Sequence, residues 1–107
     1  MAITNTSLTS NPAQTMLQAS GNIAVTTMYL CNKSPSAITA NIFLMSNGSS
    51  DFGNGVIYSN LVIQGNDTYI LEQERLLLND GDFLAGNVGS SATFDNLLVA
   101  TLSYTSI

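Results

Sequence analysis

Acidic side chains supply most of the groups in this sequence that could do chemistry. The chain contains no His, which removes Ser–His and Cys–His nucleophilic sites and the commonest transition-metal ligand. Glu72 and Glu74 lie two positions apart and would share one face of a strand, and paired carboxylates can act as acid and base on glycosidic bonds. A solvated strand face, with Arg75 as a weak partner, explains the same residues more simply.

A second acidic group lies in a run of turn-forming residues. Asn79, Asp80 and Asp82 could place oxygen atoms around Ca²⁺, but their spacing does not match a calcium-binding loop. A tight hairpin turn explains them, because Asn, Asp and Gly tolerate a left-handed backbone conformation. Lys33 beside Ser34 makes a poor Ser–Lys pair, because adjacent residues in a turn rarely face each other. The sequence therefore predicts no catalytic residue, no cofactor site and no metal site, and hence no enzyme.

The charge of the chain argues against several classes of partner. Its 107 residues carry a formal net charge of −5, and charged residues make up only 8% of them, against about 25% in an average domain. The two basic residues, Lys33 and Arg75, cannot form the patch that binding to nucleic acid or to an anionic membrane needs. No segment has a signal-peptide pattern or the roughly 20 apolar residues of a membrane span. We therefore expect a protein that stays in the cytosol until it is assembled.

The chain has a single cysteine, Cys31, so the fold cannot depend on an intrachain disulfide. This residue lies near the end of a β-rich run. A small buried hydrophobic side chain is the favoured interpretation, with a reactive thiol as the alternative.

Residues 23–45 form the segment around which the other elements are arranged. Thr, Val, Ile, Tyr and Phe dominate two runs that flank a short break at residues 33–36, and branched or aromatic side chains fit a pleated surface. Pro35 in the break has no backbone N–H and a fixed φ, so a continuous strand cannot pass through it. The segment therefore predicts a β-hairpin.

Similar β-rich runs recur about every ten residues, with turn-forming residues between them. This spacing predicts a single all-β domain over residues 1–107, an antiparallel β-sandwich of about seven to nine short strands with a jelly-roll or immunoglobulin-like fold. Residues 1–20 are open to a second interpretation, as an N-terminal arm. Residues 71–78 have the propensity for one short helical turn. The expected strands cover residues 2–8, 14–19, the two arms within 23–45, 56–63, 67–73, 83–88 and 93–104, with a short apolar segment at 76–78.

Alternation within the strands predicts which side chains form the core. In the strand at residues 56–63, Leu61 and Ile63 would face one way and Tyr58 the other. The expected core consists of Val25, Ile42, Leu61, Ile70, Leu98, Ala100 and Leu102.

The strand that ends at Met45 is apolar on both faces. Phe43 and Met45 point away from the core face of this strand, so they need cover from another strand, a loop or a partner subunit. The turn-rich loop at residues 46–55 contains Phe52, which either anchors the loop or contacts a neighbour. We predict an interface formed by Phe43, Met45, Phe52 and Tyr58. Because few charges guard the sheet edges, we expect a homo-oligomer.

Two segments resemble a known family. Residues 27–32 read Thr-Met-Tyr-Leu-Cys-Asn, and residues 67–85 read DTYILEQERLLLNDGDFLA. Their order and spacing, with a glycine-rich loop between them, resemble small virion structural proteins of tailed bacteriophages, especially those that infect marine cyanobacteria. The resemblance covers residues 21–104. It implies a β-sandwich part of the virus particle, assembled in the host cytoplasm and without catalytic residues, in which relatives would differ at residues 46–55.

The resemblance and the composition together favour a structural role. The first hypothesis is a head decoration or cement protein on the capsid exterior, bound to the major capsid protein, with a trimer favoured because capsid lattices offer threefold sites. The second is a component of the tail, neck or fibres that contacts host glycans through a modest aromatic platform at Tyr58 or Tyr69. A small hydrolase is the third, and the absence of His counts against it.

Overall fold

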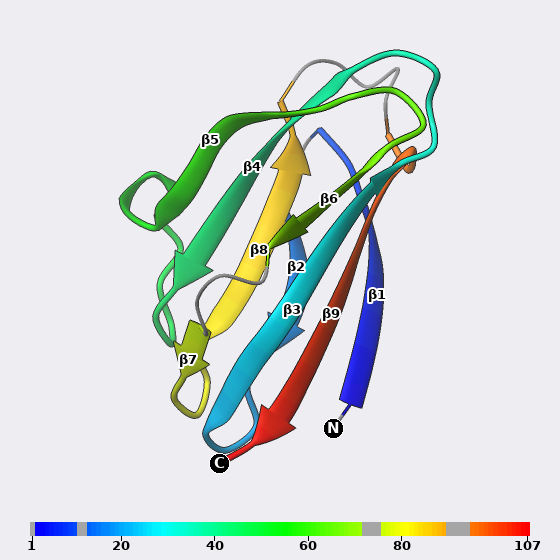
Figure 1. Ribbon diagram of the computed structural model, residues 1–107. Helices are drawn as coiled ribbons and strands as arrows, with labels where there is room; N and C mark the ends of the chain where they lie inside the picture. The colour runs from blue at the N-terminus through cyan, green and yellow to red at the C-terminus, as the bar shows by residue number, and fades with distance from the viewer. Residues whose placement is uncertain (1, 11–12, 72–75, 90–94) are drawn as a thin grey trace.

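The computed structural model describes residues 2–10, 13–71, 76–89 and 95–107. The regular structure in these residues is almost entirely β-strand, arranged in two antiparallel sheets that pack face to face (Figure 1). The predicted β-sandwich is therefore confirmed. Its elements are β1 (Ala2–Leu8), β2 (Gln14–Gln18), β3 (Ile23–Asn32), β4 (Ile38–Met45), the 3-10 turn η1 (Phe52–Asn54), β5 (Val56–Ile63), β6 (Thr68–Leu71), β7 (Leu76–Leu78), β8 (Phe83–Val88) and β9 (Leu98–Ser106).

The strand order is that of a jelly roll. One sheet has the order β1-β9-β3-β6, with β7 also pairing with β3, and the other has the order β2-β8-β4-β5. Because β9 runs along one side of β3, β6 and β7 share its other side, β6 opposite residues 28–31 and β7 opposite residues 23–25. They share one strand position, so the described strands occupy the eight positions of a jelly roll.

The first two strands belong to this sandwich. β1 pairs with β9 along its whole length, and β2 pairs with β8. Residues 2–8 and 14–18 therefore contribute one strand to each sheet, and do not form a separate arm.

Helical structure is confined to the single turn η1 within the described residues. Of the segment at residues 71–78, Leu71 ends β6 and residues 76–78 form β7, whereas residues 72–75 lie outside the described residues. Strand β9 begins at Leu98, later than predicted, because residues 95–97 form a turn and residues 93–94 lie outside the described part. No described helix has the length and apolar composition needed to cross a membrane.

The core lies between the two sheets and follows the period of two that strand geometry dictates. In β9, three alternating side chains are fully buried while those between them keep partial exposure. Most of the predicted core is confirmed: Val25, Ile42, Leu98, Ala100 and Leu102 are buried, and Leu61 is partly buried against them.

The prediction that Ile70 belongs to the core is wrong. Its side chain is 51% exposed, because β6 lies at the edge of its sheet and Ile70 occupies the outer face, opposite Tyr29 of β3. Its neighbours in β6, Tyr69 and Leu71, point toward the other sheet. The sequence prediction therefore exchanges the core face and the outer face of this strand.

A bulge in β3 sets which of its later side chains face the core. Val25 pairs with Tyr104 but Thr27 pairs with Ser103, so Thr26 is an extra residue in the strand. A bulge reverses the alternation that follows it. Consequently Cys31 faces outward and is exposed, and the expectation of a buried cysteine is wrong.

A second bulge turns Tyr58 inward. Ala40 pairs with Leu61 and Ile42 pairs with Tyr58, so β5 has one residue more than β4 between these pairs. Asn60 sits in the bulge with a φ of 55°, and its backbone N–H donates to the side-chain oxygen of Asn41 at 2.9 Å. Tyr58 and Leu61 therefore both pack against the core, and their predicted placement on opposite faces is wrong.

The prediction of a β-hairpin over residues 23–45 is wrong, because β3 and β4 pair with different strands and belong to different sheets. Asn32 fixes the loop that joins these two strands. Its side chain is 1% exposed; Nδ2 donates to the carbonyl oxygens of Ser36, Ile63 and Gln64 at 2.8, 3.0 and 3.2 Å, and Oδ1 accepts from the N–H of Ser34 at 2.9 Å. One buried amide thus joins the loop after β3 to the end of β5, and both of its polar atoms have hydrogen-bond partners within the chain.

Candidate functional site

The paired glutamates considered for acid–base chemistry, Glu72 and Glu74, lie outside the described residues, as does Arg75. Among the residues that the structure does describe, no three His, Cys, Asp or Glu side chains are placed together so that they could hold a metal ion.

The acidic segment at residues 79–82 forms a turn with a structural role, but it is not the predicted hairpin turn, because it joins β7 and β8 of different sheets. Asp82 accepts hydrogen bonds from the backbone N–H groups of Asn47 and Asn79, both at 3.0 Å. Asp80 accepts from the N–H of Gly21 at 2.7 Å. These carboxylates fasten the turn to two neighbouring loops at one end of the sandwich, since carboxylates form strong hydrogen bonds with backbone N–H groups.

Three of the four predicted interface residues meet in a small cluster on the outer face of the β2-β8-β4-β5 sheet. The ring of Phe52 lies edge-on to Phe43, with centroids 5.3 Å apart, and edge-on to Phe83, with centroids 6.4 Å apart. Phe43 and Met45 are only 7% and 3% exposed. The loop at residues 46–55 thus supplies the cover that these side chains need, and contact with a partner through them would require the loop to move.

Phe83 is absent from the sequence prediction of this cluster. It lies opposite Met45 in the β4–β8 ladder, two residues before Ala85, which also packs in the cluster. Its position directly after the 79–82 turn and its alternation with Ala85 are the signals that could have found it.

A cleft of about 390 Å³ opens between the edge strands β5 and β6. Figure 1 shows these strands diverging from the turn that joins them. The floor of the cleft is β3 around its bulge, where neither β6 nor β7 pairs with it. Its volume lies within the usual range for small-molecule sites, about 300–1,000 Å³. The described residues that line it are Val25, Thr26, Thr27, Met28, Ile57, Tyr58, Tyr69, Ile70, Leu71 and Leu76.

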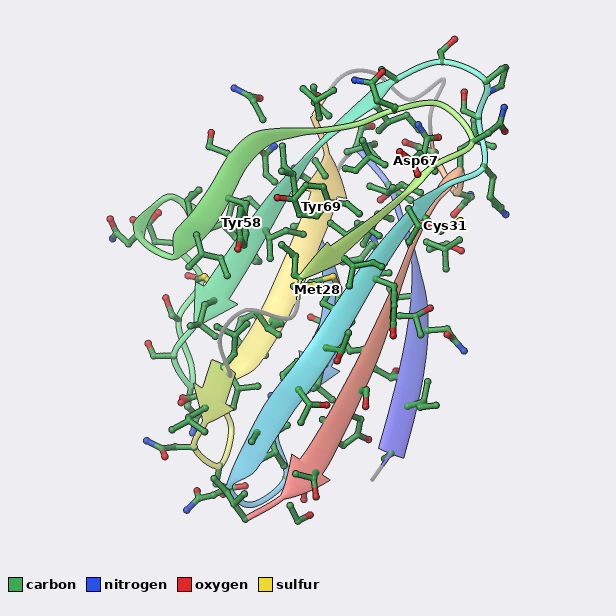
Figure 2. All side chains as sticks on the ribbon, viewed as in Figure 1. Met28, Cys31, Tyr58, Asp67 and Tyr69 are labelled. Carbon is green, nitrogen blue, oxygen red and sulfur yellow. The ribbon has the colours of Figure 1, made fainter. Side chains whose placement is uncertain are left out.

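Two tyrosines from different strands give the cleft its chemical character. Figure 2 shows Tyr58 of β5 and Tyr69 of β6 in the space between these strands, with Met28 near the end of β6. Tyr69 faces inward but stays 37% exposed, which leaves aromatic surface accessible from outside. The described lining contains no charged side chain. Aromatic rings beside hydroxyl groups suit a neutral ligand that has one apolar face and several polar groups.

Comparison with known proteins adds no residue roles to this picture. No protein-family model, curated protein or solved structure matches the chain.

The described residues on the outer face of the β1-β9-β3-β6 sheet form a broad surface without charge. The strand register identifies the residues on this face, because they alternate with the buried side chains of the same strands. Ile3 and Tyr29 on this face are 69% and 40% exposed. Such a surface can be buried against another protein without removing charges from water. The residues on this face are Ile3, Asn5, Ser7, Thr27, Tyr29, Cys31, Thr68, Ile70, Val99, Thr101 and Ser103.

Proposed function

We propose that this chain is a non-enzymatic structural protein of a tailed-phage virion, a decoration or cement protein on the capsid exterior. The observation that carries the proposal is that the described residues on the outer face of the β1-β9-β3-β6 sheet carry no charge, which suits this surface to burial against other virion proteins. The jelly-roll strand order is compatible with this role, because capsid proteins use it, although lectins and enzymes use it too.

The remaining surface fits the same role. The net charge of −5, with only two basic residues, leaves no basic surface for nucleic acid, so the chain would sit outside the packaged genome. The sandwich needs no disulfide, since its single cysteine is free, and can therefore fold in the host cytoplasm before it joins the particle. Its partners would be the major capsid protein and further copies of itself.

Counting the copies per purified virion tests this function. Quantitative mass spectrometry of virions from the phage that encodes the chain should give hundreds of copies, as expected for a head lattice. A few dozen copies or fewer would place the protein in the neck, tail or fibres. Absence from virions that contain all other structural proteins would rule out a virion role.

The cleft favours a second candidate function, a tail, neck or fibre component that contacts host glycans. Tyr58 and Tyr69 offer ring surface and hydroxyl groups from the two walls of one cleft, and sugars present apolar ring faces and hydroxyls that such a site can engage. The cleft lies at the β6 edge of its sheet, and β1 forms the opposite edge.

A matched pair of tyrosine variants tests glycan binding. If a glycan from the host surface stacks in the cleft, Tyr69→Ala should weaken its binding about three- to tenfold, the loss expected for one aromatic contact. Tyr29→Ala is the control, because Tyr29 has a similar exposure (40% against 37%) but lies on the outer face of the sheet. Equal effects of the two substitutions, or no binding to any host glycan, would exclude the cleft as a glycan site.

A further inference from the structure

Four strand positions form the edges of the two sheets, and three of them have features that hinder pairing with another chain. β2 is short and its register shifts between Thr15 and Leu17. β5 has two register shifts and a residue with positive φ. β6 and β7, which share the remaining edge position, are only four and three residues long. Short or bulged edges are the usual protection against intermolecular pairing.

β1 has none of this protection. Its seven residues pair with β9 in an unbroken register, from Ala2 opposite Tyr104 to Leu8 opposite Leu98. Its other side pairs with no described strand, and Figure 1 shows it at the outer margin of the sheet. β1 also lacks proline and charge. In a chain with so few charged residues the lack of charge says little by itself, but a regular edge of this length leaves backbone N–H and C=O groups unpaired.

We propose that β1 pairs antiparallel with β1 of a second copy, so that two sheets become one continuous sheet across a twofold axis at Asn5. In an antiparallel pair, residues that lie opposite each other must face the same side of the sheet. In a twofold pair this requires that one residue of the strand lies opposite its own copy at the axis. Only an axis at Asn5 pairs all seven residues of β1 with the partner. This twofold pair differs from the trimer that the sequence favours, and it does not depend on a place in a virion.

The sequence of β1 is complementary to itself in this register. Thr4 lies opposite Thr6 of the second copy, and Thr6 lies opposite Thr4 of the second copy. Thr–Thr pairs across antiparallel strands are favourable. Exposed Ile3 lies opposite Ser7 of the second copy. Asn5 meets its own copy at the axis. Its Oδ1 accepts from the Thr101 hydroxyl at 2.8 Å, while its Nδ2 has no partner among the described residues and can donate to the second Asn5.

Charge substitutions at the axis test the pairing. Sedimentation should show a dimer for the natural protein at high micromolar concentration. Asn5→Lys and Asn5→Asp should each raise the dissociation constant about tenfold at low ionic strength, because each places like charges opposite each other. An equimolar mixture of the two variants should dimerise again, since Lys then faces Asp. Unchanged dimerisation of both single variants would overturn the proposal.

A charge elsewhere on the same sheet separates edge pairing from association through the flat outer face. Val99→Lys adds one charge to the outer face of β9, one strand away from the edge. It should leave the dimer intact if copies pair along β1. If Val99→Lys dissociates the dimer and Asn5→Lys does not, the face is the interface and the proposed edge pairing is wrong. A natural protein that stays monomeric at high micromolar concentration also refutes it.

A distance measurement tests the geometry without altering β1. Cys31 is the only cysteine and is exposed, so it can be spin-labelled directly. Five strand spacings of about 4.8 Å and an axial offset of about four residues at 3.4 Å place the two Cys31 Cα atoms about 28 Å apart. Pulsed dipolar spectroscopy should give a single distribution near this value, broadened by the label. A distribution centred beyond about 40 Å, or no dipolar signal, contradicts the proposed register.

Discussion

The ring of Phe52 lies edge-on to that of Phe43, with centroids 5.3 Å apart and planes inclined at 70°. This contact joins the tip of a loop rich in Gly, Ser and Asn to the outer face of β4. The loop at residues 46–55 contains no strand of its own, and the aromatic contact explains how it keeps one position over Met45 and Phe43. Two predictions concern what holds such irregular segments in place, and two concern the bulges.

Replacing Phe52 with Ala should lower the free energy of unfolding by about 2 kcal/mol, since the side chain is half-buried and makes two edge-to-face contacts. Urea denaturation followed by circular dichroism measures this change. Limited proteolysis should also cut the loop faster. Ser50→Ala, an exposed position in the same loop, is the control and should change stability by less than about 0.5 kcal/mol. An equal effect of the two substitutions would show that Phe52 does not anchor the loop.

Replacing Asn32 with Asp should lower the free energy of unfolding by about 3–5 kcal/mol at pH 7, because a buried carboxylate would face the carbonyl oxygens that the amide now satisfies. Burial raises the pKa of the introduced carboxyl above its value in the unfolded chain. The folded state then binds the proton more tightly, so the loss of stability should shrink as pH falls toward about 4.

Denaturation curves between pH 4 and pH 7 measure this dependence. The control is Asn22→Asp at an exposed turn position, which should cost little at either pH. If the destabilisation by Asn32→Asp were the same at pH 4 and pH 7, the side chain would not be held among carbonyl oxygens as described.

Asn60 occupies its bulge with a φ of 55°, a conformation that Asn and Gly tolerate and β-branched residues do not. Asn60→Val should therefore cost about 1–3 kcal/mol of stability, whereas Asn60→Gly should stay within about 1 kcal/mol of the natural protein. Thermal unfolding of the two variants checks the difference. A valine variant as stable as the glycine variant would mean that the bulge is not at this residue.

Cys31 should react with a thiol reagent in the native protein at a rate within about tenfold of that in the unfolded chain, because the bulge at Thr26 turns it outward. The reaction with Ellman's reagent, with and without denaturant, gives both rates. If Cys31 in the native monomer reacts 100-fold or more slowly than in the unfolded chain, the side chain is buried, as the sequence predicts, and the outward placement is wrong.

Strand positions were predictable because each strand carries its own local pattern. Residues 2–8, 56–63 and 83–88 show alternation or β-rich composition between turn-forming residues, and all three form strands with these bounds. Which side chains of a strand face the core was less predictable. The answer depends on bulges, and the local composition around Thr26 or Asn60 does not indicate that the partner strand is one residue shorter there.

The candidate site was only partly predictable for the same reason. Tyr58 and Tyr69 were recognised as the aromatic residues available, but their cleft arises because β5 and β6 are edges of different sheets. The sequence pattern places Ile70 in the core because alternation alone does not show which face of a strand meets the other sheet. The cluster around Phe52 was closer to prediction, since both faces of β4 were visibly apolar and a loop with one large aromatic residue follows it.

The pairing of β1 with β9 has a consequence for how the protein is made. Ala2 meets Tyr104 and Leu8 meets Leu98, so β1 lacks its neighbour in the sheet until β9, far later in the sequence, has been synthesised. At about 5–20 residues per second, that wait lasts several seconds. Contacts between such distant residues also slow folding, to milliseconds or longer in all-β proteins. The backbone N–H and C=O groups of β1 therefore stay unpaired for several seconds during synthesis. Neighbouring nascent chains on the same polysome could pair through this strand in that interval, which would favour aggregation.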